Sequence, residues 1–323
     1  MVIADSNTAE LLGRRIADEC GAALFVVPAG ETSKSFERLE QLCRAAARAG
    51  LERDSVVVAV GGGVVGDLAG FCAAIFLRGV GLINVPTTLL AQVDSAIGGK
   101  TGINIPEGKN LVGAFKQPEA VYIDPELLAT LPDREYRSGL AEVAKYAMAN
   151  DAGLHESLSH GSEAVRARDI DMLTTLVERC CAIKAEVISG DETEEGPRSV
   201  LNYGHTFGHA LETASAYQAF THGEAISVGM MVAARIGTIT GVTPAGVEEK
   251  QAALLQALAL PLQAPGASAT ESMLEVMGRD KKARGGELRW VLLEDLGRAS
   301  HGHLVPPEAV EKVVAWALQT APS

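Results

Sequence analysis

Three of the chain's seven histidines fall within 18 residues of one another, at His205, His209 and His222. His205 and His209 stand four residues apart, a spacing that puts both imidazoles on one face of a helix and within reach of one metal ion. Zinc proteases share this spacing, but they carry a catalytic glutamate directly after the first histidine, where this chain has Thr206. The cluster therefore favours a metal site that is not a protease site. The alternative is three histidines satisfied by helix caps and core hydrogen bonds.

Glu142 and Lys145 lie three residues apart in the apolar stretch AEVAKY. Charged residues are seldom buried in such a helix unless they are paired, and buried pairs often take part in chemistry. The alternative is an ion pair on the helix surface, which would contribute only about 0.2–0.5 kcal/mol. This motif alone leaves both interpretations open.

The segment GGGVVGD, residues 61–67, follows an apolar run and precedes a helical pattern. It satisfies G-x-G-x-x-G, the turn that places a dinucleotide pyrophosphate at a helix N-terminus. The alternative is a turn whose glycines serve only the backbone. No acidic residue ends the next strand, LINVPTT, so the carboxylate that would hold the ribose is expected at Asp5, where the first strand ends.

Two further lysines stand beside glycines, in Gly98-Gly99-Lys100-Thr101 and in Gly108-Lys109-Asn110. Neither segment is a Walker loop, but a lysine on a glycine-flanked loop suits the capture of a phosphate. We therefore expect both segments to form loops beside an anionic ligand.

The elements that must position these residues follow from hydrophobic patterning. Short β-branched runs predict four buried strands, at residues 2–4, 23–27, 55–60 and 82–85. Amphipathic stretches between these runs predict helices, one of them at residues 36–50. From about residue 134 long Ala/Leu/Glu-rich segments predict helices, with one late strand or hairpin at 288–297. The expected fold is α/β, with a Rossmann-like parallel-sheet domain over residues 1–133 and a mainly α-helical domain over 134–323. A ligand is expected in the cleft between them.

The composition of the chain indicates which kinds of molecule it is expected to bind. A net charge of −13 argues against nucleic acid and anionic membranes, which are bound chiefly through basic patches. Hydrophobic residues make up 47% of the chain, but no run of about 18 apolar residues would span a bilayer. The first residues do not resemble a signal peptide, and the five cysteines form no CxxC pair. We expect a soluble, cytoplasmic protein whose anionic substrate meets a locally basic pocket.

Four longer segments, in this order and spacing, resemble the 3-dehydroquinate synthase family: GGGVVGDLAGFCAAIFLRGV, PTTLLAQVDSAIGGKTGIN, SGLAEVAKY and GPRSVLNYGHTFGHALE. The resemblance runs from about Asp5 to the helical C-terminus. It implies an NAD-dependent enzyme with a divalent metal, zinc or cobalt, whose ligands fall on Glu142, His205 and His222. The implied reaction oxidises a secondary alcohol, eliminates phosphate, reduces the ketone again, and closes a carbocycle by an aldol step.

The same resemblance assigns the other site residues. The implied NAD-binding positions are Asp5, Asn7, Glu31, Lys34, Gly62, Gly63, Val64, Asp67, Thr87, Thr88, Lys109 and the 127–130 stretch from Leu127 to Thr130. The implied catalytic and substrate positions are Asp94, Lys100, Lys109, Asn110, Lys145, Lys184, Glu194, Arg198, Asn202, His209 and the Lys281-Lys282 pair, of which Lys282 is taken as the contact. Arg78 matches an arginine that reaches the neighbouring subunit's site, which implies a homodimer.

Two departures from the family pattern stand out. Family members carry some tens of residues before the segment that matches Val2 to Asn7, so we expect either a shortened chain or a sheet without that extension. Pro197 precedes Arg198 where leucine is more usual. Two rival functions remain, a related sugar-phosphate cyclase whose substrate lacks the carboxylate and a metal-dependent polyol dehydrogenase, along with a non-catalytic homologue.

Overall fold

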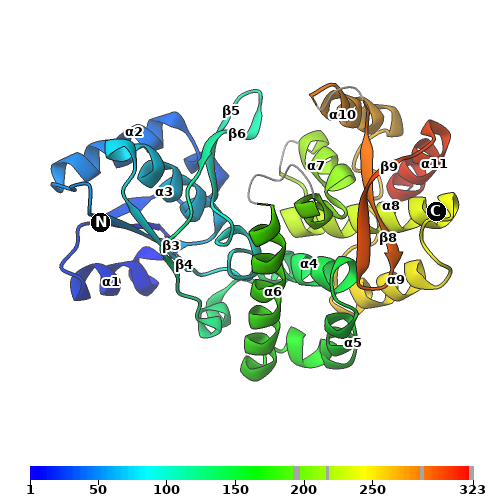
Figure 1. The fold of residues 1–323 in the computed structure, drawn as a ribbon, viewed down its shortest axis with the longest axis horizontal. Coiled ribbons are helices and arrows are strands. Elements are labelled where there is room, and N and C mark those ends of the chain that lie inside the picture. The colour runs from blue at the N-terminus through cyan, green and yellow to red at the C-terminus, as the bar shows by residue number, and fades with distance from the viewer. Residues whose placement is uncertain (192–196, 216–217, 284–286, 320–323) are drawn as a thin grey trace. The chain divides into compact units, whose positions relative to one another are not determined.

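The computed structural model describes residues 1–191, 197–215, 218–283 and 287–319, without the side chains of residues 197 and 279–283. The chain divides into two compact units, Met1–Leu131 and Pro132–Ser323, which Figure 1 shows from blue to cyan-green and from green to red. The division falls between Leu131 and Pro132.

A five-stranded parallel sheet organises the first unit, with the strand order β2-β1-β3-β4-β7. The strands are β1 (Val2–Asp5), β2 (Leu24–Val27), β3 (Val56–Gly61), β4 (Gly81–Pro86) and β7 (Ala120–Val121). The four predicted strands are therefore confirmed. The fifth has only two residues, too few for a periodic signal.

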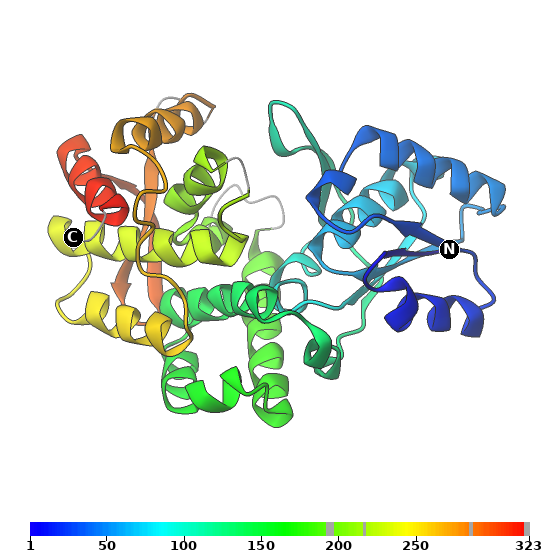
Figure 2. The same cartoon turned by 180° about the vertical axis from the view of Figure 1, so that it is seen from behind.

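Helices cover both faces of this sheet. They are α1 (Arg14–Glu19), α2 (Phe36–Arg48) and α3 (Gly63–Ile75). Along β3, Val57 and Ala59 belong to the core formed with α2 and α3, whereas Val60 belongs to a second core formed with α1. Figure 2 shows α1 on the opposite face from α2 and α3. In such a sheet, with both faces covered, the edge formed by the carboxyl ends of the strands is the usual place for a ligand.

An antiparallel hairpin, β5 (Lys100–Ile105) paired with β6 (Gly108–Phe115), also belongs to the first unit. The prediction that Lys100 and Lys109 stand on loops is therefore wrong, because both lie within strands. The hairpin lies close to α3: a Cβ added at Gly70 would come within 2.4 Å of Thr101 Cγ2. Glycines interrupt the alternation of polar and apolar residues, which conceals the strands in the sequence.

The second unit is mainly helical, as predicted. Its helices are α4 (Asp133–Ala149), α5 (Ala152–Arg166), α6 (Ile170–Gly190), α7 (His205–Ala214), α8 (His222–Thr240), α9 (Val247–Ala257), α10 (Thr270–Ala283) and α11 (Pro307–Leu318). The late β signal is a hairpin of β8 (Arg289–Asp295) and β9 (Arg298–Leu304). In the described part of the chain, no helix has the length and apolarity to cross a membrane.

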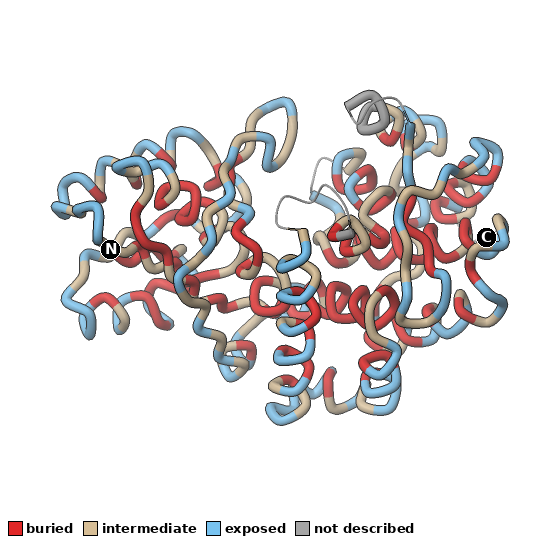
Figure 3. The backbone as a smooth tube through the Cα atoms, in the orientation of Figure 1, coloured by how far each residue is buried: buried red, intermediate tan, exposed pale blue. Residues whose placement is uncertain are grey.

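Helices α4 and α8 form the centre of this unit, and Figure 3 shows both as largely red, buried tubes. Their close packing depends on glycines. A Cβ at Gly223 would come within 2.0 Å of the Ser138 carbonyl oxygen, and one at Gly229 within 2.0 Å of the Gly204 carbonyl oxygen. Because Gly204 directly precedes α7, this contact holds the start of α7 against α8.

Gly229→Ala should therefore lower the free energy of unfolding by about 1–3 kcal/mol, because the new methyl group forces α8 away from the start of α7. Urea unfolding measures the change. Gly278→Ala in α10 is the matched control, since nothing lies within 4 Å of its added Cβ; this substitution should leave stability equal or raise it by up to about 1 kcal/mol. Equal stability of Gly229→Ala and wild type would contradict the close approach of the two helices.

Candidate active site

Three potential metal ligands from three helices converge in the second unit. Glu142 comes from the buried α4, His205 is the first residue of α7, and His222 is the first residue of α8. Glu142 Oε1 lies 3.2 Å from His222 Nε2 and 3.6 Å from His205 Nε2. One ligand atom from each residue lies within 4.8 Å of the others, close enough to hold a metal ion.

The donor set of this group fits a catalytic divalent metal. One carboxylate oxygen and two imidazole nitrogens are the ligands of many catalytic zinc sites, which keep further positions for water or substrate. His205 Nδ1 lies 3.2 Å from the carbonyl oxygen of Tyr203, to which it donates a hydrogen bond, so its Nε2 is left to accept a metal. The alternative interpretation, in which the histidines only cap helices and form core hydrogen bonds, does not explain why these three ligand atoms converge.

The charges around Glu142 support the same conclusion. Glu142 is fully buried and forms an ion pair with Lys145 through Oε2, so the interpretation as a surface ion pair is wrong. Burial opposes the charge of Glu142, but Lys145 and the hydrogen bond from His222 outweigh it and hold the pKa of the carboxyl well below its usual range. A buried carboxylate kept ionised in this way is a ready ligand for a cation.

The two imidazoles differ in their protonation. Burial lowers the pKa of His205 to about 3, so its ring is neutral, the form that binds a metal. Burial also disfavours the charged form of His222, but hydrogen bonds with Glu142 and Glu212 outweigh it and raise the pKa of this ring to about 10. A divalent cation that binds here must therefore displace a proton from His222.

Two more side chains adjoin this cluster, His209 and Glu212 on α7. The His209 ring centroid lies 5.1 Å from that of His205 and 6.0 Å from that of His222. Glu212 is buried, and its Oε2 lies 3.2 Å from His222 Nδ1. Glu212 is absent from the sequence-based site, although it ends the quoted segment GHTFGHALE; its spacing of three from His209 was the available signal.

Three buried, positively charged residues lie on α4 and on two elements that contact it. Lys145 lies in α4, Lys184 in α6, and Arg198 in the 3₁₀ helix η6 (Pro197–Asn202); these three elements contact one another. Arg198 is only 3% exposed and Lys184 only 6%. Asn202 closes the same 3₁₀ helix. Such a concentration of buried positive charge in an acidic protein suits a carboxylate or phosphate ligand.

In the first unit the glycine-rich segment forms the predicted strand–turn–helix. Gly61 ends β3, and α3 begins at Gly63 without a side-chain cap. A Cβ at Gly62 would lie 2.9 Å from Thr88 Cγ2, and one at Gly63 would lie 3.1 Å from Ser95 Oγ. The backbone at this turn is thus close to its neighbours, and the uncapped N–H groups of a 13-residue helix suit an anionic group.

A second polar group of the first unit centres on Lys34, which is 4% exposed. Its Nζ donates to Asp67 Oδ2 at 2.6 Å and to Asn110 Oδ1, and lies 3.6 Å from Glu31 Oε1. These four predicted site residues are therefore brought together. Asn104, which the sequence-based site omits, joins them: its side chain donates to Glu31 at 2.7 Å and accepts from the Asn110 backbone N–H at 2.9 Å.

Asp5 stands where the first strand ends, as predicted. Its Oδ1 accepts hydrogen bonds from the backbone N–H groups of Asn7 and Thr8 and from the Thr8 hydroxyl. The Thr8 hydroxyl also lies 2.9 Å from the carbonyl oxygen of Val60 in β3. Asp5 and Asn7 are thus fixed in a turn at the same edge of the sheet as the glycine-rich segment.

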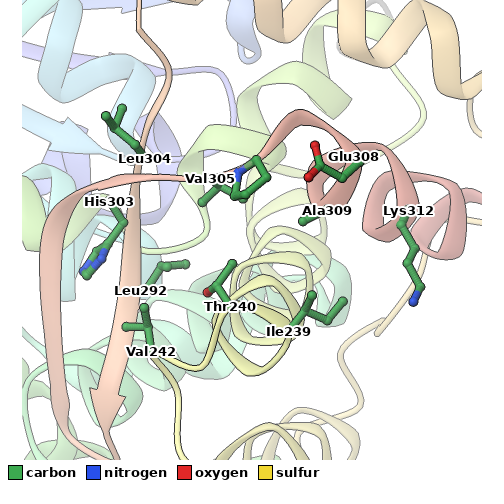
Figure 4. Close-up of a pocket in the computed structure, with 11 residues that line it drawn as sticks. Ile239, Thr240, Val242, Leu292, His303, Leu304, Val305, Glu308, Ala309 and Lys312 are labelled. Atoms are coloured by element: carbon green, nitrogen blue, oxygen red, sulfur yellow. The ribbon is translucent and has the colours of Figure 1, made fainter.

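One cavity in the described part of the second unit contains none of these residues. About 530 Å³ in volume, it is lined by the end of α8, the β8–β9 hairpin and the start of α11. Figure 4 shows its mainly apolar wall, with His303, Glu308 and Lys312 as the charged or titratable groups. The candidate active site is therefore defined by convergent ligands and charges and not by this cavity.

Comparison with known proteins places the chain in a family. Residues 24–138 match the family model described as 3-dehydroquinate synthase N-terminal, and residues 139–283 match the one described as 3-dehydroquinate synthase C-terminal. The chain belongs to the 3-dehydroquinate synthase family. The 3-dehydroquinate synthase of Geobacter metallireducens is 48% identical to it over 301 residues, which cover 92% of this chain and 83% of the relative.

Two solved structures of sugar-phosphate cyclases share the fold of this 3-dehydroquinate synthase family member. The 2-epi-5-epi-valiolone synthase of Streptomyces hygroscopicus, solved with NAD⁺ and Zn²⁺, has a TM-score of 0.90 and 28% identity, covering 98% of this chain and 89% of that one. A 2-deoxy-scyllo-inosose synthase complexed with carbaglucose-6-phosphate, NAD⁺ and Co²⁺ has a TM-score of 0.88 and 29% identity, covering 98% and 90%. The predicted fold class is confirmed.

The other site residues that the family resemblance predicts lie in both units. Asp94 lies in a π-helical turn (Ala91–Ser95) that contacts α3, Thr87 follows β4, and Leu127 and Thr130 belong to a 3₁₀ helix (Pro125–Thr130). Arg78 is exposed just after α3. Glu194 lies outside the described residues, as do the side chains of Lys281 and Lys282.

Proposed function

We propose that this chain is a 3-dehydroquinate synthase, which converts 3-deoxy-D-arabino-heptulosonate 7-phosphate to 3-dehydroquinate and phosphate. The observation that carries the proposal is the convergence of Glu142, His205 and His222 on one point, with Lys145 beside it. Membership of the 3-dehydroquinate synthase family supports this reaction. The candidate metal ligands, the glycine-rich turn and the buried positive charge are features that the reaction requires.

The metal ligands in this proposal are Glu142 Oε1 and the Nε2 atoms of His205 and His222. A bound zinc or cobalt ion lowers the pKa of a coordinated hydroxyl group and stabilises enolate-like charge. Lys145 holds the other oxygen of Glu142, which fixes the carboxylate plane. Lys145 also stands where a proton can be exchanged with a substrate held at the ligands.

NAD in this proposal lies along the carboxyl ends of the parallel strands. When bound there, NAD would supply reversible hydride transfer with the substrate alcohol, so no net oxidation would result. The uncapped start of α3 binds the pyrophosphate, and Asp5 lies at the strand end where a ribose carboxylate ligand is usual. The Lys34 group, with Asp67, Glu31 and Asn110, keeps the adjoining surface polar.

The substrate in this proposal is a sugar phosphate that also bears a carboxylate. Lys184, Arg198 and Asn202 bind the carboxylate, and the lysines of the β5–β6 hairpin bind phosphate together with Lys282. Buried cations strengthen each charge-assisted hydrogen bond because little water competes. These local positive charges allow a protein with a net charge of −13 to bind a substrate that carries several negative charges.

The balance of NADH distinguishes this function from a metal-dependent polyol dehydrogenase. Catalytic amounts of NAD should support many turnovers of the heptulosonate phosphate, and the absorbance at 340 nm should return to its starting value. A dehydrogenase would instead accumulate one NADH for each substrate molecule consumed, which would reject the proposal.

We also propose that the active form is a homodimer in which Arg78 completes the partner's phosphate site. Leu77 and Arg78 have φ values of 51° and 69°, in the left-handed region that residues with side chains seldom adopt. Such strain persists where function requires it. The side chain of Arg78 is exposed, so it is accessible to a second copy of the chain.

Mixing inactive Arg78→Ala with inactive His205→Ala should restore activity to about one quarter of the wild-type value, because random exchange of subunits leaves about one site in four without either lesion. The measurement is phosphate release after subunit exchange, with each variant alone as the control. If labelled subunits exchange and activity stays absent, Arg78 does not serve the partner's site.

Finally, we propose that the protein acts in the cytoplasm. All five cysteines are free thiols. The sulfur atoms of Cys43 and Cys72 lie 3.9 Å apart, too far for a disulfide bond. Free thiols fit a reducing compartment.

A further inference from the structure

The two nitrogens of His222 face two different carboxylates. Its Nε2 lies 3.2 Å from Glu142 Oε1, on the side of the metal cluster, and its Nδ1 lies 3.2 Å from Glu212 Oε2, on the opposite side. Glu142 is fully buried, and the side chain of Glu212 is only 8% exposed. The ring is therefore held between two carboxylates that water scarcely reaches.

We propose that Glu212 is a positioning residue that orients His222 for the metal. By accepting the Nδ1–H of His222, the carboxylate fixes the tautomer in which Nε2 carries the lone pair, and it also fixes the plane of the ring. The negative charge of Glu212 makes Nε2 a stronger donor to a cation. The inference rests on the proposed metal site and adds a residue that does not itself touch the ion.

The arrangement around His205 supports this role for Glu212. His205 also has its Nδ1 held by an oxygen, the backbone carbonyl of Tyr203 at 3.2 Å, while its Nε2 faces Glu142 Oε1. Both imidazoles thus follow one rule: an oxygen acceptor holds Nδ1, and Nε2 faces the shared carboxylate. For His205 the acceptor is part of the backbone, whereas for His222 it is a side chain that can be replaced.

Helix geometry explains why Glu212 can reach His222. His205 and Glu212 stand seven residues apart on α7, two turns along the same face, and His209 stands between them. Helix α8 begins with His222 at the side of this face, and α7 and α8 pack closely through Gly229 and Gly204. The same face of α7 therefore supplies one metal ligand and the support for another.

A competing interpretation is a second cation site, since His209, Glu212 and His222 also bring one ligand atom each within 4.8 Å. Two ions would then bind the two nitrogens of His222 at once, which requires the ring to lose both of its protons. A neutral imidazole offers only one lone pair to a metal. The positioning role needs no such step, and the number of ions bound per chain separates the two interpretations.

The test measures metal binding by the full-length protein without NAD or substrate, so that its outcome is independent of the proposed reaction. Glu212→Ala and Glu212→Gln are compared with wild type by competition for Zn²⁺ against a chromogenic chelator and by the visible absorption spectrum of bound Co²⁺. Glu248→Gln is the matched control, a partly buried helical glutamate that contacts Arg235 at 3.5 Å in α8 and lies outside the cluster.

Glu212→Ala should weaken Zn²⁺ binding by about 10–100-fold and alter the Co²⁺ spectrum, while wild type binds one ion per chain. Glu212→Gln should lose less affinity than Glu212→Ala, because its amide oxygen can still accept the Nδ1–H. Glu248→Gln should match wild type in both measurements. Wild-type affinity and spectrum in folded Glu212→Ala would overturn the proposal, and so would two ions per chain with one lost in this variant.

Discussion

Wild-type protein should use the heptulosonate phosphate at least about 10⁴-fold more efficiently than sedoheptulose 7-phosphate, which lacks the carboxylate, when the two values of kcat/KM are compared. The reason is the burial of Lys184 and Arg198, which are 6% and 3% exposed. A substrate without the carboxylate forgoes the charge-assisted hydrogen bonds proposed for Lys184 and Arg198, and a site built to bind a polar group strongly rejects an analogue that lacks it.

Arg198→Ala should reduce this discrimination. Loss of one charge-assisted hydrogen bond costs about 1.5–3 kcal/mol, which lowers kcat/KM for the acid roughly 10- to 150-fold. The neutral analogue should be affected much less, so the ratio of the two kcat/KM values falls. Arg198→Lys should lie between, because lysine keeps the charge but lacks the two-pronged geometry.

Arg166→Ala, an exposed arginine of α5, is the matched control and should leave the ratio unchanged. If wild-type protein used both substrates equally well, the carboxylate-binding role of Lys184, Arg198 and Asn202 would be wrong, and a cyclase acting on a neutral sugar phosphate would be the better proposal.

The second large effect is expected at the metal ligands. His205→Ala should lose the divalent ion and lower kcat by at least about 10³-fold, since a Lewis-acid metal supplies several kcal/mol of transition-state stabilisation. The metal content of the purified variant is measured by atomic absorption beside the rate of phosphate release. Chelation of the wild-type protein should produce the same loss, and added Zn²⁺ or Co²⁺ should restore activity to wild type but not to the variant.

His160→Ala is the matched control for this substitution, because His160 is an exposed histidine of α5 outside the cluster. It should keep both the metal and the activity. An unchanged metal content in folded His205→Ala would show that His205 is not a ligand, and the site would have to be reassigned.

Much of the architecture could be predicted from local patterns. The four buried strands and the helical second half follow from hydrophobic periodicity, which depends on neighbours in the chain. The glycine-rich turn could be predicted equally well, because a strand, a G-x-G-x-x-G segment and a helix follow one another directly in the sequence. The β5–β6 hairpin was missed because Gly102 and Gly113, which pair with each other across it, carry no side chain to show alternation.

The candidate site was harder to predict from residue spacing. Spacing groups His205 with His209, but the structure places the Nε2 of His205 beside Glu142 and His222, which come from other helices. Glu142 stands 63 residues from His205 in the sequence, and the packing of α8 against both α4 and α7 brings them together. The resemblance to the family, and not periodicity, named these three residues.

Two contributors escaped prediction for a related reason. Asn104 and Glu212 act through their neighbours, Asn104 by joining Glu31 to Asn110 and Glu212 by contacting His222. A side chain of this kind has no characteristic spacing, because its partner is set by tertiary structure. Such residues become visible only when the hydrogen bonds of the folded chain are known.

The most direct test of the proposed function is the product balance of a single reaction. Purified protein, one equivalent of Zn²⁺ or Co²⁺, a catalytic amount of NAD and excess heptulosonate phosphate should yield phosphate and 3-dehydroquinate in equal amounts, followed by NMR, with no NADH remaining. Phosphate release without the carbocycle, or NADH formed in proportion to the substrate consumed, would contradict the assignment of this chain as a 3-dehydroquinate synthase.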